Sequence, residues 1–211
     1  MAATAATAEM AEKFSAGAMV KGTMLRAHLD WALRHLGEAS SDWPSPLSPE
    51  AARLVGRTVL STDWIPFRLL IDIDRAIAAA AVAIPCTEDS EAPWPAPGAV
   101  FRDLGRHSAA LNLGGVYRSF VSSEPHRFFE RTSVLHHQFQ NFGRSTYERT
   151  GERSGLIRIE GYTSYSPVFC TAGAGYFEEA LHLMHVPGRA QVVEPSCHCR
   201  GDSACVFEAR L

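Results

Sequence analysis

The residue types best suited to metal chemistry gather near the end of the chain. Three cysteines and a glutamate lie within the twelve residues from Glu194 to Cys205. Seven residues, including the turn-forming pair Gly201-Asp202, separate Cys197 from Cys205, so a hairpin would bring these two sulfurs to one point. Zinc takes about four nitrogen, sulfur or oxygen ligands in a tetrahedron. The two thiolates could supply two of them.

Two more ligands are expected from neighbouring elements. Cys170 falls in the first turn of an expected helix, where the helix dipole favours a thiolate. Glu194 ends the strand that leads into the cysteine-rich loop and is the expected fourth ligand, with Cys199 and His198 as alternates. Four protein ligands leave no position open for water, so the site would be structural. On spacing alone, a surface loop of reduced cysteines is the competing interpretation, because the pattern is not a C-x-x-C pair.

The elements that must position these residues follow from the hydrophobic pattern. Apolar residues at helical spacing predict helices that begin at Leu25, Ser48-Pro49, Asp63, about Val100, Ser123 and Ser166. The fourth is expected to reach Val121, the fifth Gly143 and the last Pro187-Gly188. A period of two over 145–150 and 156–163, and again over 190–194 and 205–210, predicts two β-hairpins.

This order of elements predicts an α+β fold, with N-terminal helices packed on a small, mainly antiparallel sheet. Residues 1–18 are expected to be a flexible leader, and residues 19–211 a single ligand-binding type of domain. Within that domain, 19–143 is the helical half, and 144–211 is a hairpin-helix-hairpin unit that carries the metal site.

Composition narrows the class of protein. The chain has 211 residues, of which 46% are hydrophobic and 20% charged, which excludes a disordered chain. The net charge of -3 shows no basic excess, so no nucleic-acid partner is expected. The longest apolar run, Ala76–Cys86, is about half of the roughly 20 residues that a membrane span needs. We therefore expect a cytoplasmic protein, in which five cysteines favour metal binding or free thiols over disulfides. Cys86 is expected to be incidental.

A second group of residues could line a ligand pocket. His107 lies on an apolar helix face between Leu104 and Leu111, which suits a pocket histidine or a haem iron ligand. A core histidine bonded to a backbone carbonyl is the competing interpretation. Four aromatic residues are expected to join it in binding a ligand: Trp64, Tyr165, Phe169 and Tyr176. Ordinary packing of helix and sheet would also explain their positions.

Other patterns favour structural interpretations. The adjacent pair His136-His137 points to different helix faces and is expected on a solvated side. The phenylalanines at 128, 129, 139 and 142 are expected in the core. No phosphate-loop, dinucleotide, H-E-x-x-H or G-x-S-x-G motif is present, and no catalytic set can be nominated from spacing. We therefore expect no enzymatic activity.

The cysteine pattern also carries a resemblance. Cys170, then Glu194-x-x-Cys197, then a glycine-containing loop to Cys205-x-Phe207, resembles the C-terminal signature of the 4-vinyl reductase domain family. This family includes sensor domains of phenol-responsive transcription activators and a protein of bacteriochlorophyll synthesis. In the phenol sensors, the positions that match Cys170, Glu194, Cys197 and Cys205 bind a structural zinc. Although the family name suggests a reductase, the resemblance implies a module that binds a small molecule.

A longer stretch resembles a second group of proteins. From Val20 onward the chain is similar to an uncharacterised paralogous family abundant in myxobacteria, over Val20-Lys21-Gly22, residues 63–67 and Leu104-Gly105-Arg106. The wider superfamily implies the ligand-binding fold of haem nitric oxide sensors, phenol-sensor domains and vesicle-tethering subunits. It also implies a homodimer through the helical half. Because no helix-turn-helix, kinase or ATPase segment is recognised in the 211 residues, signalling is expected through contact with a partner protein.

These observations favour a non-enzymatic sensor or carrier domain with a structural zinc and a small hydrophobic or aromatic ligand. A protein–protein interaction or scaffold subunit of the same fold is the first alternative. A haem or tetrapyrrole binder is the second.

Overall fold

The computed structural model describes residues 10–37, 47–84, 94–121, 124–186 and 191–211. Its helices are α1 (Gly22–Leu36), α2 (Pro49–Val55), α3 (Phe67–Val82), α4 (Pro97–Gly114), α5 (Pro125–Glu130), α6 (Thr132–Phe139) and α7 (Pro167–Leu183). Its strands are β1 (Met19–Lys21), β2 (Trp64–Pro66), β3 (Arg144–Gly151), β4 (Ser154–Glu160), β5 (Gln191–Ser196) and β6 (Cys205–Arg210). Short 3-10 turns form at Arg118–Phe120 and His198–Arg200.

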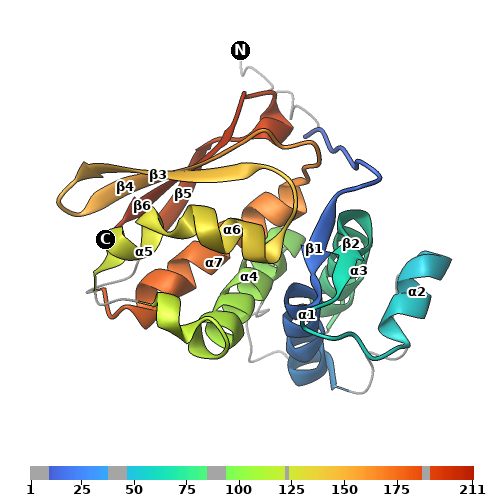
Figure 1. Ribbon diagram of the computed structural model, residues 1–211. Coiled ribbons are helices and arrows are strands. Elements are labelled where there is room, and N and C mark those ends of the chain that lie inside the picture. The colour runs from blue at the N-terminus through green and yellow to red at the C-terminus, as the bar shows by residue number, and fades with distance from the viewer. Residues whose placement is uncertain (1–9, 38–46, 85–93, 122–123, 187–190) are drawn as a thin grey trace, which may run out of the picture.

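Helices and sheet form separate layers. Strands β3, β4, β6 and β5 lie in that order in an antiparallel four-stranded sheet, and α5, α6, α7 and α4 lie along one side of it (Figure 1). On β4, buried and half-buried residues alternate, and the buried Ile157 and Ile159 contribute to the core. The expected α+β fold with helices on a small antiparallel sheet is confirmed.

Two glycines allow α4 and α7 to cross in close contact. A Cβ atom at Gly105 would lie 1.8 Å from the carbonyl oxygen of Ala172, and one at Gly175 would lie 1.9 Å from that of Arg102. Arg102 also binds the Glu178 carboxylate through Nε at 2.9 Å. This crossing fixes α7, whose first turn carries Cys170.

Serine–proline pairs start two of the helices as the sequence predicts. The Ser48 hydroxyl accepts a hydrogen bond from the Ala51 amide at 3.2 Å, and Pro49 is the first residue of α2. At α7 the Ser166 hydroxyl accepts from the Val168 amide at 3.3 Å. The second cap places the beginning of α7, and therefore Cys170, against the sheet.

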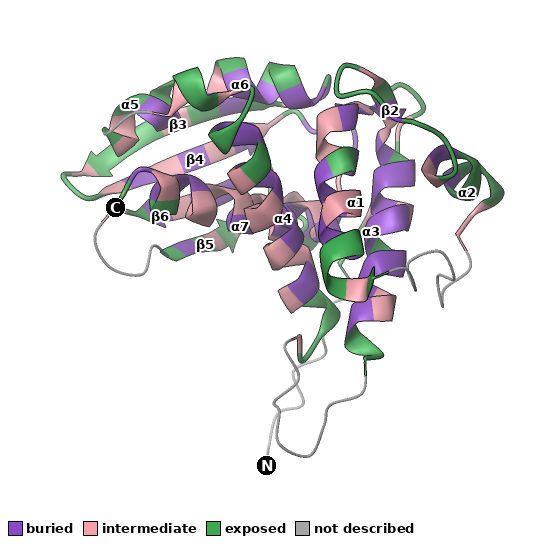
Figure 2. Cartoon of the chain, turned by 90° about the horizontal axis from the view of Figure 1, so that it is seen from below, coloured by how far each residue is buried: buried purple, intermediate pink, exposed green. Residues whose placement is uncertain are grey.

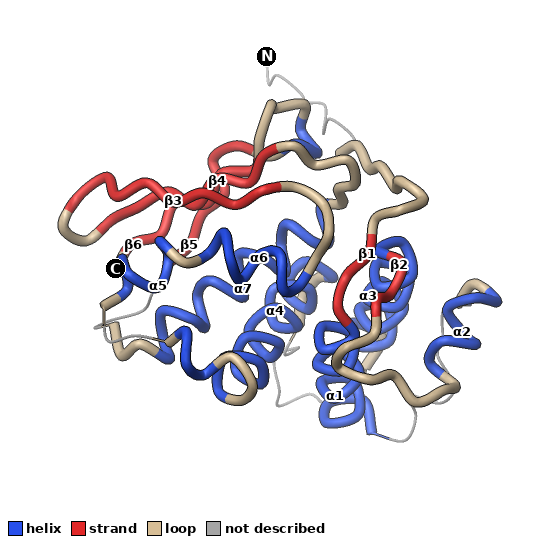
Figure 3. The backbone as a smooth tube through the Cα atoms, in the orientation of Figure 1, coloured by secondary structure: helices blue, strands red, loops and turns tan. Residues whose placement is uncertain are grey.

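The prediction that a helix begins at Asp63 was wrong for its first residues. Trp64–Pro66 form strand β2 instead, which pairs with β1 in a two-stranded sheet beside α3 (Figure 3). Val20 faces Ile65 in this pair, and both are fully buried. Helix α3 begins only at Phe67. Ten of its 16 residues are buried, and Figure 2 shows most of it in the colour of buried residues.

Two other helices end earlier than the sequence predicts. Helix α4 ends at Gly114 rather than Val121, because the chain turns so that the Tyr117 amide donates to the Asn112 carbonyl at 3.0 Å. The single helix predicted from Ser123 to Gly143 is divided into α5 and α6. At the break, the Thr132 hydroxyl donates to the Phe129 carbonyl at 2.7 Å.

Part of the expected leader is bound to the domain. The Ala11 amide donates to the Cys199 carbonyl at 2.8 Å, and Lys13 exchanges two backbone hydrogen bonds with Tyr165, at 3.0 and 2.9 Å. The Phe14 ring lies 5.7 Å from the Phe67 ring, centroid to centroid. The prediction of a flexible leader over 1–18 is therefore corrected for residues 10–18, while 1–9 lie outside the described residues.

Among the described residues, no helix combines the length and apolar character that a membrane crossing requires.

Candidate metal centre and adjoining cavity

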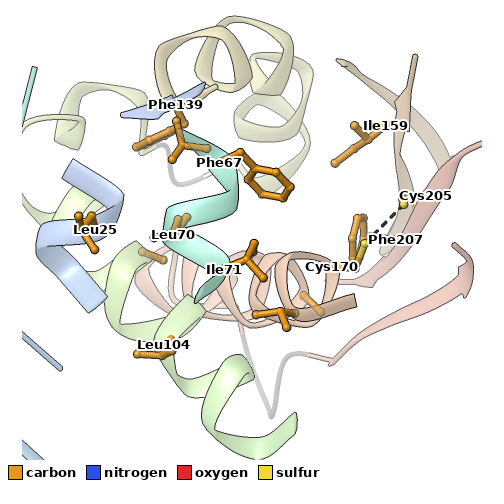
Figure 4. Close-up of a cluster of buried hydrophobic side chains, with 14 of the residues drawn as sticks. Leu25, Phe67, Leu70, Ile71, Leu104, Phe139, Ile159, Cys170, Cys205 and Phe207 are labelled. Carbon is orange, nitrogen blue, oxygen red and sulfur yellow. Dashed lines mark hydrogen bonds between the residues drawn. The ribbon is translucent and has the colours of Figure 1, made fainter. Parts of the chain in front are cut away.

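Four side chains, from one helix, two strands and a loop, converge at one end of the sheet. Cys170 comes from the first turn of α7, Glu194 from β5, Cys197 from the loop after β5 and Cys205 from the start of β6. One ligand atom from each of the four lies within 4.8 Å of all the others. Figure 4 shows Cys170 and Cys205 side by side, next to Phe207. The structure therefore brings together the ligand set predicted from the sequence.

The distances between sulfurs suit a tetrahedral metal site. Cys170 Sγ lies 3.6 Å from Cys205 Sγ and 3.7 Å from Cys197 Sγ. Zinc–sulfur bonds of about 2.3 Å in a tetrahedron place two sulfurs roughly 3.8 Å apart. The cluster needs little movement to hold a metal ion of that coordination.

The loop between β5 and β6 is folded so that its backbone supports the thiols. The Cys197 amide donates to Asp202 Oδ2 at 2.7 Å, and the His198 amide donates to Cys205 Sγ at 3.3 Å. Gly201 takes a φ of 92°, in the left-handed region that glycine adopts most readily. These contacts fix both sulfurs of the predicted hairpin.

Glu194 is placed inward by an irregularity in β5. The ladder to β6 shifts register between Val193 and Ser196, a segment that includes Pro195, which has no amide hydrogen to donate. Among the described residues, Glu194 Oε1 is buried without a hydrogen-bond partner, and Oε2 lies 3.7 Å from Arg200 Nη1. Burial, and then the charge of the Cys197 thiolate, raises the pKa of Glu194 to about 8. A cation at the cluster would satisfy this buried oxygen.

The thiols themselves share protons. Cys170, Cys197 and Cys205 are all buried. Hydrogen bonds to Cys197, Cys199 and Cys205, followed by burial, hold the pKa of Cys170 well above its usual range. The pKa of Cys197 is lowered, because the neighbouring thiols donate to it. A divalent cation would replace these shared protons, so the cluster is chemically able to hold a metal ion.

The two alternate ligands stand outside the four-residue set. Cys199 is buried beside the cluster, but its sulfur is not among the four mutually close ligand atoms. The His198 ring packs edge-on against Tyr165, with 4.5 Å between ring centroids. The geometry therefore favours Glu194 over either alternate. Cys86 lies outside the described residues.

A cavity of about 110 Å³ adjoins the cluster, between the helices and the sheet. Its wall is mostly apolar and includes Leu135, Phe139, Ile159, Phe169, Tyr176 and Phe207. Cys170 belongs to both the group of four candidate metal ligands and the cavity wall. Two residues expected in a ligand pocket, Phe169 and Tyr176, lie in this wall.

The other three expected pocket residues do not line the cavity. His107 Nε2 lies 2.7 Å from Asp30 Oδ2 on α1. This nitrogen is therefore engaged by a carboxylate at the interface between helices. Trp64 is 41% exposed on β2, and the Lys21 ammonium lies 4.0 Å above its ring. Tyr165 faces His198 instead. The expectation that all five residues share one pocket is corrected, and His107 has no place as an iron ligand in this cavity.

Two buried histidines in the wall were not expected there. His136, predicted on a solvated helix side, is buried, and its Nε2 lies 2.9 Å from the Phe142 carbonyl oxygen. Burial lowers the pKa of His136. His28 is 2% exposed and pairs with Asp74 through Nδ1. One sequence signal could have found this pair, because Asp74 is a charged residue on the apolar face of its helix.

Comparisons with known proteins identify the fold. No protein-family model and no curated protein matches the chain. Solved structures of H-NOX proteins do match. An H-NOX protein from S. oneidensis in the Fe(II)NO ligation state has a TM-score of 0.64 at 14% identity, covering 90% of this chain and 98% of that one. An Fe(II) unliganded H-NOX protein from K. algicida has a TM-score of 0.63 at 12% identity, covering 90% and 95%.

A third match is an oxygen-binding H-NOX domain related to soluble guanylate cyclases, with a TM-score of 0.61 at 12% identity, covering 90% and 94%. The chain therefore has the H-NOX fold. This confirms the expected fold, described above as that of haem nitric oxide sensors. At these identities the likeness shows the fold alone, so the ligand has to be argued from the residues of this chain.

Proposed function

We propose that this protein is a ligand-binding domain that senses or carries one small hydrophobic or aromatic molecule and is held together by a structural zinc. The observation that carries this proposal is the apolar cavity of about 110 Å³ between the helices and the sheet. An engineered apolar cavity of about 150 Å³ in another protein takes up benzene. The cavity described here is of the size that suits one aromatic ring.

Zinc is the metal that best matches the donor set. Three soft thiolates outnumber the one hard carboxylate, and a tetrahedral set dominated by sulfur favours zinc over the hard cations calcium and magnesium. Cys170, Cys197, Cys205 and Glu194 would hold the ion, and Arg200 would offset part of the excess negative charge. When bound, zinc supplies no reaction here, since four protein ligands leave no position open. It would tie α7 to β5 and β6.

The shared residue Cys170 places the metal cluster in the wall of the ligand cavity. The position of α7 then depends on the ligand on one side and on the metal on the other. This arrangement supports a sensor function. A ligand that moves α7 would also move Cys170, and so would change the geometry of the metal site at the end of the sheet.

Haem is the second candidate, favoured by the likeness to solved H-NOX structures. The residues present do not fit it. A cavity of about 110 Å³ suits one ring, whereas a porphyrin contains four pyrrole rings. None of the described residues in the wall is a lysine or arginine that could pair with the haem carboxylates. We expect protein expressed with added haem to show no Soret band, and a stoichiometric Soret band would replace the one-ring ligand with haem.

Thermal unfolding in the presence of benzene or toluene tests the proposed ligand class. At ten times the Kd, a ligand stabilises the folded state by about 1.4 kcal/mol, which raises Tm by roughly 4 °C for a chain of this size. Gly173→Leu should abolish this shift, because Gly173 lines the cavity and a Cβ there meets only the Phe207 ring, at 3.6 Å. Gly173→Ala is the matched control and should keep a measurable shift. No shift in the unmodified protein would count against the cavity and favour the scaffold alternative.

Four further expectations stay proposals. We expect a homodimer through the helical half, which sedimentation equilibrium would measure. We expect a signalling partner protein and no catalytic activity. We also retain the resemblance to the 4-vinyl reductase domain family as a prediction, which recovery of a stoichiometric zinc would support.

A further inference from the structure

Residues 10–18 form a strap that binds both segments of the chain that carry the candidate metal ligands. At one end of the strap, the Ala11 amide donates to the Cys199 carbonyl at 2.8 Å. Cys199 lies in the loop between β5 and β6, and the candidate ligands Cys197 and Cys205 stand on either side of it. This hydrogen bond therefore ties the strap to the loop that holds two of the thiols.

The next residues of the strap hold the approach to α7. Lys13 exchanges two backbone hydrogen bonds with Tyr165, and the Ser166 hydroxyl donates to Glu12 Oε1 at 2.5 Å. Ser166 is the buried N-cap of α7 and stands four residues before the candidate ligand Cys170. The strap thus bridges the helix that supplies one thiol and the loop that supplies the other two.

Polar contacts, rather than burial, attach most of the strap. None of residues 10–17 is buried, and the two large apolar side chains among them, Met10 and Phe14, are 48% and 39% exposed. The ion pair between Glu12 and Arg75 on α3 is also partly exposed, so it contributes little. Segments with few buried apolar contacts open at a low cost in free energy while the rest of the domain stays folded. The strap is an element of this kind.

A metal ion would fix the two segments that the strap bridges. Zinc at the four candidate ligands would join the loop between β5 and β6 to the first turn of α7. The strap binds both segments, so its hydrogen bonds require that the two keep their relative position. Without the metal, the segments are free to shift apart, and the strap keeps only part of its hydrogen bonds. By linkage, the strap must stabilise the bound metal by as much as the metal stabilises the attached strap.

We propose that residues 10–18 are a metal-dependent strap, which stays attached while zinc occupies the four ligands and detaches when zinc leaves. This inference rests on the zinc of the proposed function and adds a consequence of its binding. The strap converts the state of a buried metal centre into the exposure of a chain segment at the surface.

Digestion with endoproteinase Lys-C reports the state of the strap, because the chain contains only two lysines. Lys13 lies in the strap, where its carbonyl accepts from the Tyr165 amide at 2.9 Å, whereas Lys21 lies in β1. Removal of zinc with a chelator should speed cleavage after Lys13 about tenfold and leave cleavage after Lys21 unchanged. Faster cleavage after both lysines would show that metal loss unfolds the domain, which would overturn the strap.

Ala11→Pro tests the coupling from the other side, because proline has no amide hydrogen to donate to the Cys199 carbonyl. Its zinc affinity, measured by competition with a chelator, should fall about fivefold. Ala16→Pro is the matched control, since the Ala16 amide makes no hydrogen bond among the described residues. Ala16 follows Ser15 in a turn that the Ala18 amide closes on the Ser15 carbonyl at 3.0 Å, a position that favours proline. This control should bind zinc as the unmodified protein does.

The failure of the strap and the failure of the metal centre give different results. Equal cleavage after Lys13 with and without zinc, in protein that binds one zinc per chain, would overturn the strap and leave the metal centre standing. Equal zinc affinities of the two proline variants would overturn the coupling in the same way. A folded protein that binds no zinc would overturn both the strap and the proposed metal centre.

Discussion

Replacing Cys205 by serine should release the proposed zinc and lower Tm by roughly 10 °C. Cys205 Sγ is fully buried and lies 3.6 Å from Cys170 Sγ, in the group of four ligand atoms. Without the metal, α7 loses its tie to β6 and a buried carboxylate keeps an unpartnered oxygen. We expect a loss of about 4 kcal/mol in the free energy of unfolding, which corresponds to that change in Tm for a domain of this size. Calorimetry and metal analysis of the same sample would measure both effects.

Cys199→Ser is the matched control, since Cys199 is equally buried and adjacent but stands outside the ligand set. It should retain one zinc per chain and a Tm within about 3 °C of the unmodified protein. Equal zinc loss in both variants would assign Cys199 to the site in place of Glu194. A Cys205→Ser protein with its zinc and its Tm intact would show that the four side chains form no metal centre.

Gly175→Ala should destabilise the protein by about 3 kcal/mol or more, although it adds only one methyl group. The added Cβ would lie 1.9 Å from the Arg102 carbonyl oxygen, a backbone atom that cannot rotate away. Helices α4 and α7 would have to separate along their crossing. The Arg102–Glu178 ion pair, which spans the same crossing, would be disturbed with it. Urea unfolding would give the change in the free energy of unfolding.

Gly173→Ala provides the comparison, two residues earlier on the same helix. Its Cβ would meet only the Phe207 ring, at an ordinary contact distance of 3.6 Å. Since alanine favours helix over glycine by about 1 kcal/mol, this variant should be as stable as the unmodified protein or slightly more so. Similar losses of stability in both variants would show that the crossing of α4 and α7 is looser than described.

The convergence of the four candidate metal ligands could be predicted because most of its geometry is local in sequence. Cys197 and Cys205 flank a short loop between paired strands, and Glu194 lies in the first of them, three residues before Cys197. Cys170 enters through a helix whose Ser166 cap is visible in the sequence. Periodicity and turn residues determine these placements, and the structure confirms that the four side chains converge.

Contacts between distant segments were less predictable. Strands β1 and β2 have three residues each, which is too few for a period of two to appear in the sequence. Because β2 pairs with β1, Trp64–Pro66 are extended and do not join the helix that follows. His107 lies on an apolar helix face, but this pattern cannot show that the Asp30 carboxylate would contact its Nε2 atom. The pair His28–Asp74 joins two helices whose packing no local pattern specifies.

Native mass spectrometry on gently purified protein tests the central claim most directly, with a denaturing run for comparison. We expect one zinc per folded chain and, in protein that retains its ligand, an additional mass within the range of a one-ring compound. Both should be lost on denaturation. A folded chain with no zinc would contradict the assignment of Cys170, Glu194, Cys197 and Cys205, and the mass of a haem would contradict the one-ring cavity.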